Sequence, residues 1–462
     1  MNEGSAADPS SFRDPSGYLF HRGDQLYRQV NRRYKEDYDV LMDSGLYGEL
    51  VAGGLLVPHE EVELDPLDPA TVYKTIKPEL VPFVSYPYEW CFSQLKDAAL
   101  ATLAIQKKAL SHGMSLKDSS AYNIQFKDCR PLLIDTLSFE RFVPGQPWIA
   151  YRQFCQHFLA PLALMSYRDP RVSQLLRANL DGIPLDLASG LMPTRSKFRF
   201  SLLSHIHLQA RSLEKYEKKS AQIETVGRFS ENAFRGLIES LQGAVERLRL
   251  RGKKTEWADY YEETNYDKAA FDRKRELVRE LIARADPLTV WDLGANMGLF
   301  SRIANEKAGF TLSLDSDHSA VERNYLECRE KGDKGMLPLL VDLTNPSPGI
   351  GWQNRERMSL SARGPADVGL ALALIHHLAI SGNLPFGMIS DYFSQICDTL
   401  IIEFVPKDDS QVQWLLSSRE DIFDDYTPEE FEKQFSRHFD IAEGTAIEST
   451  KRTLYLMEKM AT

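Results

Sequence analysis

The chain has 462 residues with 55 basic and 66 acidic side chains, which gives a formal net charge of −11 at pH 7. This length favours two domains, and the acidic balance argues against a broad surface for nucleic acid or for an anionic membrane. The five cysteines are widely spaced without a CxxC pair, so we expect reduced thiols in a cytoplasmic protein rather than disulfides or a bound metal.

The chain begins with a polar leader and a region of short strands. Met1–Gly17 lacks the basic and apolar segments of a signal peptide, and we expect it to be disordered. Two strand-like runs around a turn follow at Tyr18–Val30, a pattern typical of a hairpin. A helix is predicted at Tyr34–Leu55, and the β-branched residues, aromatics and prolines of Thr71–Trp90 favour strands and a bent connection.

Helices dominate the remainder of the first half. Apolar residues at helical spacing predict a helix at Phe92–Ser111, and strands are expected at Tyr122–Phe126 and Pro131–Ile134. Trp148–Leu250 is mostly helical in pattern. Because a basic run begins at the end of this stretch, we place the domain boundary there, with an α+β domain over 18–250 and a second domain over 251–462.

Strands alternate with helices in the second half. A helix at Phe271–Ala283 precedes a series of strands predicted at Leu288–Leu293, Thr311–Leu314, Leu337–Val341, Asp367–Leu374 and Thr399–Phe404, and the chain finishes with strands at Phe439–Ala446 and Thr453–Lys459. This alternation predicts a parallel α/β sheet with an antiparallel finish. No apolar run reaches the roughly 18 residues that a membrane span requires, so no membrane partner is expected.

The most informative stretch is VWDLGANMGLF at Val290–Phe300. It predicts a strand, a tight turn with two glycines and a helix start, a combination that lets the backbone approach a ligand. Asp315 ends the next strand about 20 residues further on, where a carboxylate can bind the hydroxyls of a ribose. Asp342 ends the third strand. Acids at the ends of three successive strands favour a nucleoside site over three unrelated helix caps.

The turn itself departs from the dinucleotide-binding pattern. Asp292 stands directly before it, and a third glycine is missing from the GxGxxG spacing. An acid at this position repels a phosphate and favours a cationic amino-acid group. The sequence therefore argues against a pyrophosphate ligand.

DLGANMGLFS, with the acids at Asp315 and Asp342, resembles the first three motifs of the class I S-adenosylmethionine-dependent methyltransferases. The runs ALALIHHLAI, LIIEFVPKDD and REDIFDDY resemble the nodulation-protein-like branch of that superfamily. The resemblance implies a doubly wound Rossmann-like sheet that binds S-adenosylmethionine, with Gly294 at the methionine part, Asp315 at the ribose and Asp342 beside the adenine. The implied cofactor-binding residues are Asp292, Gly294, Asn296, Gly298, Asp315 and Asp342.

Methyl transfer is an in-line displacement, so the protein has to align the acceptor and take up a proton from it. His376 and His377 follow the fourth strand, and Glu403 ends the fifth. These three residues are the catalytic candidates, each with capping or structural roles as the alternative. We expect only one histidine to serve, because adjacent side chains on a strand or loop point apart.

The first domain contains Lys117–Asn123 followed by Ile134 and Asp135, which resembles the catalytic loop and metal-binding acid of protein-kinase-like phosphotransferases. The resemblance implies a kinase-like site at Asp118, Asn123 and Asp135 with Mg-ATP as a possible ligand. A glycine-rich phosphate loop is missing, and only Arg28, Lys74 and Lys77 are candidates to anchor a nucleotide. We therefore expect a kinase-like domain that binds substrate or a partner without phosphoryl transfer.

Together these patterns predict a cytoplasmic two-domain methyltransferase that acts on an O or N atom of a small metabolite or specialised product. Two alternatives remain open: a bifunctional protein whose kinase-like half transfers phosphate from ATP, and a nucleoside-binding scaffold protein. A small-molecule acceptor is the expected partner.

Overall fold

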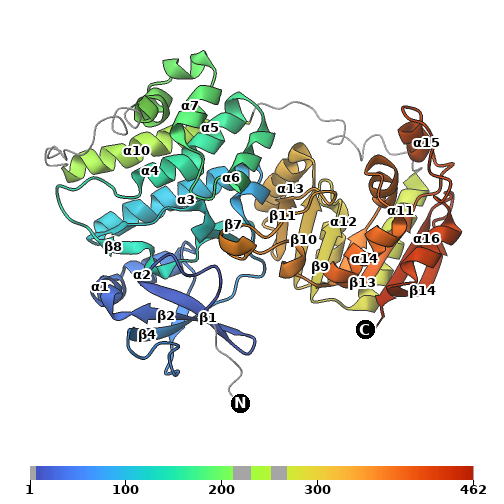
Figure 1. Cartoon of the computed structure of the whole chain (residues 1–462), viewed down its shortest axis with the longest axis horizontal. Coiled ribbons are helices and arrows are strands. Elements are labelled where there is room, and N and C mark those ends of the chain that lie inside the picture. Colours follow the sequence, from blue (N-terminus) through green and yellow to red (C-terminus); the bar gives the residue numbers. More distant parts are fainter. Residues whose placement is uncertain (1–6, 212–229, 251–267, 461–462) are drawn as a thin grey trace. The chain divides into compact units, whose positions relative to one another are not determined.

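The computed structural model describes residues 7–211, 230–250 and 268–460. The chain divides into two compact units (Figure 1), the first formed by Met1–Arg251 with Ile350–Arg357 and the second by Gly252–Gly349 with Met358–Thr462. The first unit thus ends one residue after the expected boundary, but it also includes a short segment from the second half of the chain. All five cysteines are buried free thiols.

The first unit begins with a four-stranded antiparallel sheet in the order β1-β2-β4-β3. Its strands are β1 (Gly17–Arg22), β2 (Gln25–Asn31), β3 (His59–Glu61) and β4 (Val72–Pro78). The predicted hairpin is confirmed as β1 and β2. The predicted helical stretch at Tyr34–Leu55 contains two helices, α1 (Lys35–Asp43) and α2 (Leu46–Ala52). The break lies at Gly45, whose φ of 84° is left-handed and cannot continue a helix.

The expectation of a disordered leader is wrong for the described residues 7–16. Ala7 forms a β-bridge with Phe20, and Asp8 N donates to Leu19 O at 2.8 Å. Ser16 is buried. The segment pairs with β1, a contact that its polar composition did not indicate, and residues 1–6 lie outside the described part of the chain.

A largely helical region follows in the same unit. It opens with α3 (Phe92–Ser111), as predicted. Two short antiparallel pairs come next, one of β5 (Met114–Leu116) with β8 (Phe139–Arg141), the other of β6 (Ile124–Lys127) with β7 (Arg130–Leu133). The further helices and helical turns are α4 (Tyr151–Phe154), η5 (Cys155–Leu159), α5 (Ala160–Tyr167), α6 (Leu175–Ala178), α7 (Leu185–Leu191), η7 (Thr194–Phe198), α8 (Phe200–Leu202), η8 (Leu203–Leu208) and α10 (Glu231–Arg247).

The second unit contains a seven-stranded sheet in the order β11-β10-β9-β12-β13-β15-β14. The strands are β9 (Thr289–Leu293), β10 (Phe310–Asp315), β11 (Met336–Leu340), β12 (Ala366–Ala371), β13 (Cys397–Phe404), β14 (Phe439–Ala446) and β15 (Thr453–Lys459). Strand β15 is antiparallel to both of its neighbours, while β9 to β13 are parallel. The predicted parallel sheet with an antiparallel finish is confirmed.

Helices complete this α/β unit. They are α11 (Lys268–Ala285), α12 (Leu299–Asn305), α13 (His318–Lys331), α14 (Phe386–Ile396), α15 (Ser410–Leu416) and α16 (Pro428–Phe435). The apolar faces of α11 and α12 pack on side chains of β9, β12 and β13 in one buried core. None of the described helices has the length and apolarity to cross a membrane.

The strand order of the second unit determines where a ligand can bind. Strand β9 lies between β10 and β12, so the chain runs in opposite directions across the sheet on the two sides of β9. Ligands of doubly wound sheets bind at such a point, beyond the carboxyl ends of the strands. The glycine turn and the three predicted acids follow these strand ends.

Candidate cofactor and active site

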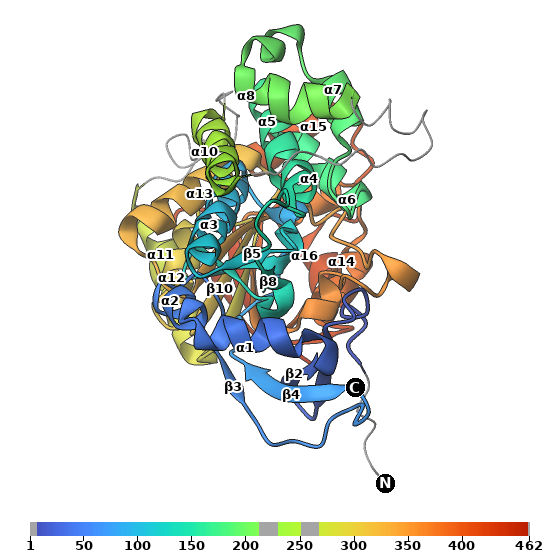
Figure 2. The ribbon, with the colours of Figure 1, turned by 90° about the vertical axis from the view of Figure 1, so that its left-hand side faces the viewer.

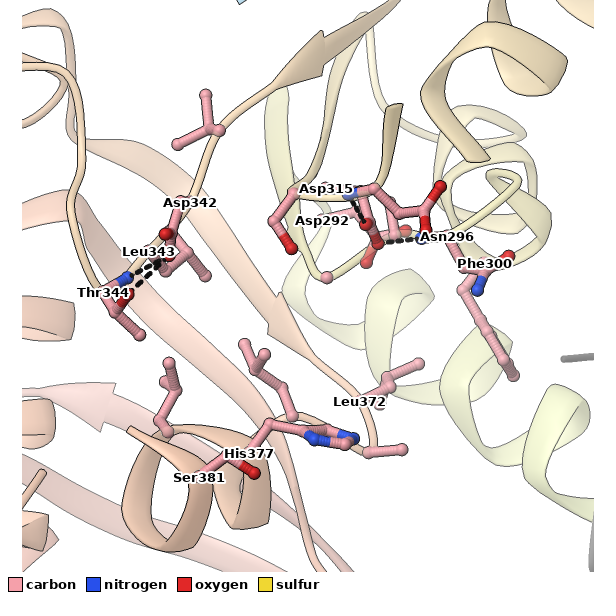
Figure 3. A pocket seen from close by; sticks show the side chains of 18 of the residues that line it. Asp292, Asn296, Phe300, Asp315, Asp342, Leu343, Thr344, Leu372, His377 and Ser381 are labelled. Atoms are coloured by element: carbon pink, nitrogen blue, oxygen red, sulfur yellow. Dashed lines mark hydrogen bonds between the residues drawn. The ribbon is translucent and has the colours of Figure 1, made fainter. Parts of the chain in front are cut away.

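A cavity of about 420 Å³ lies in the second unit at the carboxyl ends of β9 to β12. Its lining includes six of the residues predicted from sequence, Asp292, Gly294, Asn296, Asp315, Asp342 and His377 (Figure 3). Gly298, His376 and Glu403 are not in its lining. The structure therefore brings together most of the predicted cofactor residues and one of the catalytic candidates.

The turn after β9 has a backbone that favours glycine at its first position. Gly294 has φ +82°, and a Cβ there would lie 3.2 Å from Leu374 Cδ1. The amides of Gly294 and Ala295 both donate to Leu314 O at 2.8 Å, which ties the turn to β10. Asn296 also adopts a positive φ of 51°. The absence of a side chain at Gly294 thus lets the turn lie close to Leu374, and Gly294, Ala295 and Asn296 all line the cavity.

Gly298 serves packing instead of lining the cavity. It has φ +79°, and an added Cβ would lie 2.4 Å from Oδ1 of Asn324 on α13. The Asn324 amide donates to Ser313 Oγ at 2.8 Å on β10. The second glycine therefore lets α12 begin close to α13, a role that the spacing alone did not distinguish from ligand contact.

Asp315 is held by the same turn. Its Oδ2 accepts a hydrogen bond from Asn296 N at 2.7 Å, and its Oδ1 accepts one from Asp317 N at 2.8 Å. Burial raises the pKa of Asp315, although these backbone hydrogen bonds oppose the shift. The backbone of Ser316 also hydrogen-bonds to this carboxylate, and because its two oxygens have about four acceptor positions, Asp315 can accept one further hydrogen bond from a ligand.

Asp292 has a less polar setting. It is buried, and its Oδ2 accepts a hydrogen bond from Ser301 Oγ at 2.6 Å. Burial raises the pKa of Asp292 to about 7, with the hydrogen bond from Ser301 opposing the shift. The side chain therefore changes charge near neutral pH, and its ionised form suits a cationic ligand group.

Asp342 lies in another part of the cavity wall, beside Leu343 and Thr344 in Figure 3. Its Oδ1 accepts hydrogen bonds from Thr344 N at 2.8 Å and from Thr344 Oγ1 at 2.7 Å. The side chain is exposed. These contacts fix its direction and leave Oδ2 accessible.

The two histidines follow the end of β12, where the chain turns into a short π-helix (His377–Ser381, η11). His377 lines the cavity, and burial lowers its pKa to about 4, so its imidazole is neutral at pH 7. His376 is buried away from the cavity lining, and burial lowers its pKa as well. The rings lie 4.2 Å apart between centroids, so they do not point apart as expected, because helical backbone replaces the predicted strand or loop.

Glu403 is enclosed by charged and polar groups instead of facing the cavity. It is fully buried and accepts hydrogen bonds from Lys274 Nζ at 2.6 Å, from Ala373 N at 2.8 Å and from Arg452 at 3.4 Å. These contacts fix the turn after β12 that leads to His377. The geometry gives Glu403 a positioning role for that turn.

Lys274 is a residue of the cavity that sequence reasoning missed. It lies on α11, lines the cavity and is stacked over the Phe300 ring at 5.0 Å. Burial lowers the pKa of Lys274, and Glu403 opposes that shift. A sequence signal existed, because Lys274 occupies the apolar face of the helix at helical spacing from Ala270 and Leu277. A lone lysine on a buried face requires a partner.

The kinase-like candidates also come together, within the first unit. Asp118 follows β5, Asn123 ends the short helical turn before β6, and Asp135 follows β7. Burial raises the pKa of Asp118, and the nearby Asp135 adds to the shift, while Asn123 opposes it through a side-chain hydrogen bond. Ser138 Oγ donates to Asp135 at 2.7 Å and lies 3.3 Å from Asn123 Nδ2.

A cation of the protein already neutralises this site. Arg28 on β2 forms an ion pair with Asp135 at 2.5 Å, and both side chains are largely buried. Burial works against ionisation of Asp135, but Arg28 and Ser138 hold its pKa below the usual value. Among the described residues, no group of His, Cys, Asp and Glu side chains has an arrangement that could hold a metal ion.

Comparison with curated proteins finds a relative over nearly the whole chain. The sequence is 36% identical over 457 residues to nodulation protein NoeA of Rhizobium meliloti (strain 1021), and the alignment covers 97% of this chain and 95% of the relative. No family model matches the chain.

Solved structures with similar folds include several methyltransferases. Magnesium protoporphyrin IX methyltransferase from Synechocystis PCC 6803, solved with bound SAH, is 16% identical over 44% of this chain and 93% of its own, with a TM-score of 0.31. N-methyltransferase NodS from Bradyrhizobium japonicum WM9 is 8% identical over 42% and 99%, with a TM-score of 0.32. The bifunctional kinase-methyltransferase WbdD is 15% identical over 43% and 41%, with a TM-score of 0.31. All three TM-scores lie below 0.5.

Proposed function

Because the chain belongs to the family of nodulation protein NoeA and its second unit has a methyltransferase fold, we propose that the protein transfers a methyl group from S-adenosylmethionine to an O or N atom of a small acceptor. The observation that carries the proposal is the convergence of Asp292, Asp315 and His377 on one cavity beside the glycine turn. The volume of about 420 Å³ lies in the range of small-molecule sites.

The residues of the cavity fit the parts of this cofactor in order. Asp315 can accept a hydrogen bond from a ribose hydroxyl, and Asp342 in another part of the wall is the acid assigned to the adenine side. The turn at Gly294 leaves room for the methionine part, with Asp292 as the acid for its cationic groups. Lys274 lines the same cavity, but its ammonium group is paired with Glu403.

The chemistry requires alignment more than covalent participation of the protein. When bound, S-adenosylmethionine supplies a methyl group that is already activated for displacement. Leu372 and Leu378 give the cavity an apolar part of its wall. A neutral imidazole nitrogen of His377 takes up the proton of an OH or NH acceptor.

The first test is titration calorimetry with S-adenosylmethionine. The full chain should bind it, and Asp315→Ala should weaken binding roughly tenfold to a hundredfold, because a charge-assisted hydrogen bond to the ribose is lost. Asp440→Ala, which removes an exposed acid on edge strand β14, is the control and should bind as tightly as the unaltered chain. Equal affinity of the Asp315 variant would contradict the site.

The acceptor can be found by incubating cell extract with isotopically labelled methyl donor and identifying the labelled product. The relative's name directs the search to extracts of nodulating bacteria. His377→Gln should lower the turnover rate and leave the affinity for S-adenosylmethionine unchanged, because the residue acts on the acceptor. A variant with full turnover would exclude His377 as the base.

We also infer that the first unit is a kinase-like domain without phosphoryl transfer, which binds the acceptor or a partner. The support is Arg28, which occupies the carboxylate of Asp135 where a magnesium ion would bind. Titration with Mg-ATP should show no binding to the full chain. Magnesium-dependent ATP binding that Asp135→Ala abolishes would instead favour the bifunctional alternative.

A further inference from the structure

The first unit carries two phenylalanines that are almost completely exposed. Phe198 ends η7 with 86% of its surface exposed, and Phe200 begins α8 with 81% exposed. They are the most exposed of the large apolar side chains in the described part of the chain. Single exposed apolar residues are ordinary, but two fully exposed rings two residues apart need a reason.

The two rings flank the junction between η7 and α8. Arg199 between them is extended, with φ −97° and ψ 108°, and separates the end of η7 from the start of α8. Two partly exposed leucines, Leu187 and Leu191, lie on α7, which contacts η8 directly after α8. Figure 2 shows α7 and α8 next to each other at one end of this unit.

Basic side chains alternate with these rings. Lys197 and Arg199 are exposed on either side of Phe198, and Arg195 and Arg211 are exposed nearby. Between Leu185 and Arg211 the sequence contains these four basic residues and a single acid, Asp186. The segment is therefore locally positive in a chain with a net charge of −11.

This combination matches the chemistry of an anionic bilayer surface. Aromatic rings enter the boundary between headgroups and acyl chains, while lysine and arginine remain at the level of the negative headgroups. A soluble anion would be bound by the charges alone and would leave the rings exposed to water. We propose that Arg195–Phe200, here called the KFRF segment, docks the protein on the surface of membranes that contain anionic phospholipid.

The net charge of the chain argued against binding to an anionic membrane, and the proposal revises that expectation. Net charge acts over the whole molecule, but salt screens interactions beyond about 10 Å at moderate ionic strength. A local positive segment can therefore attract an anionic surface although the chain is acidic. The docking is peripheral, since the rings are on the surface and no described helix can span a bilayer.

Vesicle flotation with the full chain tests the proposal. The protein should float with vesicles of equal parts phosphatidylcholine and phosphatidylserine at low salt, and much less with phosphatidylcholine alone or at high salt. Phe198→Ser with Phe200→Ser should reduce the bound fraction at least about tenfold, and Lys197→Glu with Arg199→Glu should do the same. These residues are exposed, so the substitutions should not affect folding, which circular dichroism checks.

Leu288→Ser is the matched control, because Leu288 is 77% exposed and lies in the second unit. It should bind vesicles like the unaltered chain. Equal binding by the double phenylalanine variant, or no binding to phosphatidylserine vesicles at low salt, would overturn the proposal. Concentration-dependent self-association that the phenylalanine variant abolishes, without vesicle binding, would also overturn it and assign the segment to a second copy of the chain.

Discussion

At the scale of single residues, Asp292 makes the cavity sensitive to pH. Burial raises its pKa to about 7, so the carboxylate is mostly protonated at pH 6 and mostly ionised at pH 8. Only the ionised form attracts a cationic methyl donor. We therefore expect the affinity for S-adenosylmethionine to rise about tenfold between these pH values. Calorimetry at both values measures it, with Asp292→Asn as the variant that should lose the pH dependence.

The same shift affects stability with the opposite sign. The folded chain holds the Asp292 proton up to about pH 7, whereas the unfolded chain releases it near the ordinary value of 3.8. The contribution of this group to stability is therefore present at low pH and is lost as the pH rises from about 4 to about 7. For the binding prediction, an affinity for S-adenosylmethionine that falls as the pH rises from 6 to 8 would contradict the assignment of the ionised form of Asp292 to binding.

A comparison of Gly298 and Gly332 separates two costs of adding a side chain at a glycine, the strain of a left-handed backbone and the steric overlap of a Cβ with its neighbours. Both have a positive φ, but a Cβ at Gly298 would meet Asn324 at 2.4 Å, whereas at Gly332 it would meet nothing within 4 Å. We expect Gly332→Ala to cost about 1 kcal/mol from strain alone. Gly298→Ala should cost about 2–4 kcal/mol, because overlap adds to strain. Urea unfolding of the two variants gives the difference, and equal values would contradict the packing role of Gly298.

At the scale of elements, a buried charge network joins α11 to the sheet. Glu403 on β13 contacts Lys274 on α11, Ala373 after β12 and Arg452 before β15. Arg452 also forms an ion pair with Asp409 at 2.8 Å. The carboxylate of Glu403 thus balances two buried cations and holds the turn that positions His377.

Substitutions in this network should lower the free energy of unfolding by different amounts, in a definite order. Glu403→Gln leaves the buried Lys274 without its anion and Arg452 with Asp409 alone, and should destabilise the fold by about 3–5 kcal/mol. Lys274→Met should cost less, because Glu403 keeps Arg452 and Ala373. The double variant should cost less than the sum of the single ones. Arg279→Ala breaks an exposed pair with Glu306 and serves as the control, at no more than about 1 kcal/mol. Urea unfolding measures all four, and additive values would contradict the coupling.

At the scale of the whole molecule, the chain returns to its first unit after β11. Ile350–Arg357 belongs to that unit, although it lies between β11 and β12 of the second. Arg13 donates to both carboxylate oxygens of Glu356 at 2.5 and 2.9 Å, and Arg357 lies over the Tyr122 ring at 4.6 Å. The segment therefore completes the first unit with residues that a cut at the boundary would remove.

Arg13→Ala should destabilise the first unit. Glu356 is 2% exposed, and the hydrogen bond from Arg13 is the main cause that holds its pKa below the usual value. Because Arg13 itself is 56% exposed, we expect a modest loss of about 1–2 kcal/mol at pH 7. Hydrogen exchange of residues 7–22 should increase. Arg141→Ala is the control, since Arg141 is similarly exposed, at 53%, and its partners Glu36 and Asp37 are 73% and 24% exposed, more than Glu356.

The pH dependence of that loss has a definite sign. A folded-state pKa below the ordinary 4.5 means that Glu356 stabilises the fold above that value and loses its contribution as the pH falls through the folded-state pKa. The difference between Arg13→Ala and the unaltered chain should therefore shrink in acid. A difference that is independent of pH would contradict the role of the carboxylate.

Features set by local pattern were predictable from the sequence. The strands of the second unit, the helix α3 and the glycine turn follow from periodicity and turn chemistry within a few residues. The acids at Asp292, Asp315 and Asp342 were placed because parallel strands end at one edge of a sheet. Arg28 was only one of three candidates for the first unit, since no local pattern indicates which cation reaches Asp135.

The sequence by itself thus determined the sheet, the turn and the acids around a nucleoside-sized cavity. Only the tertiary structure decided that His377 rather than His376 lines this cavity, that Lys274 pairs with Glu403 across 129 residues, and that Glu356 serves the first unit. The physical reason is the distance along the chain over which each kind of interaction acts. Backbone preferences act between neighbours, whereas the partner of a buried charge is chosen by desolvation and by contacts between residues that folding brings together.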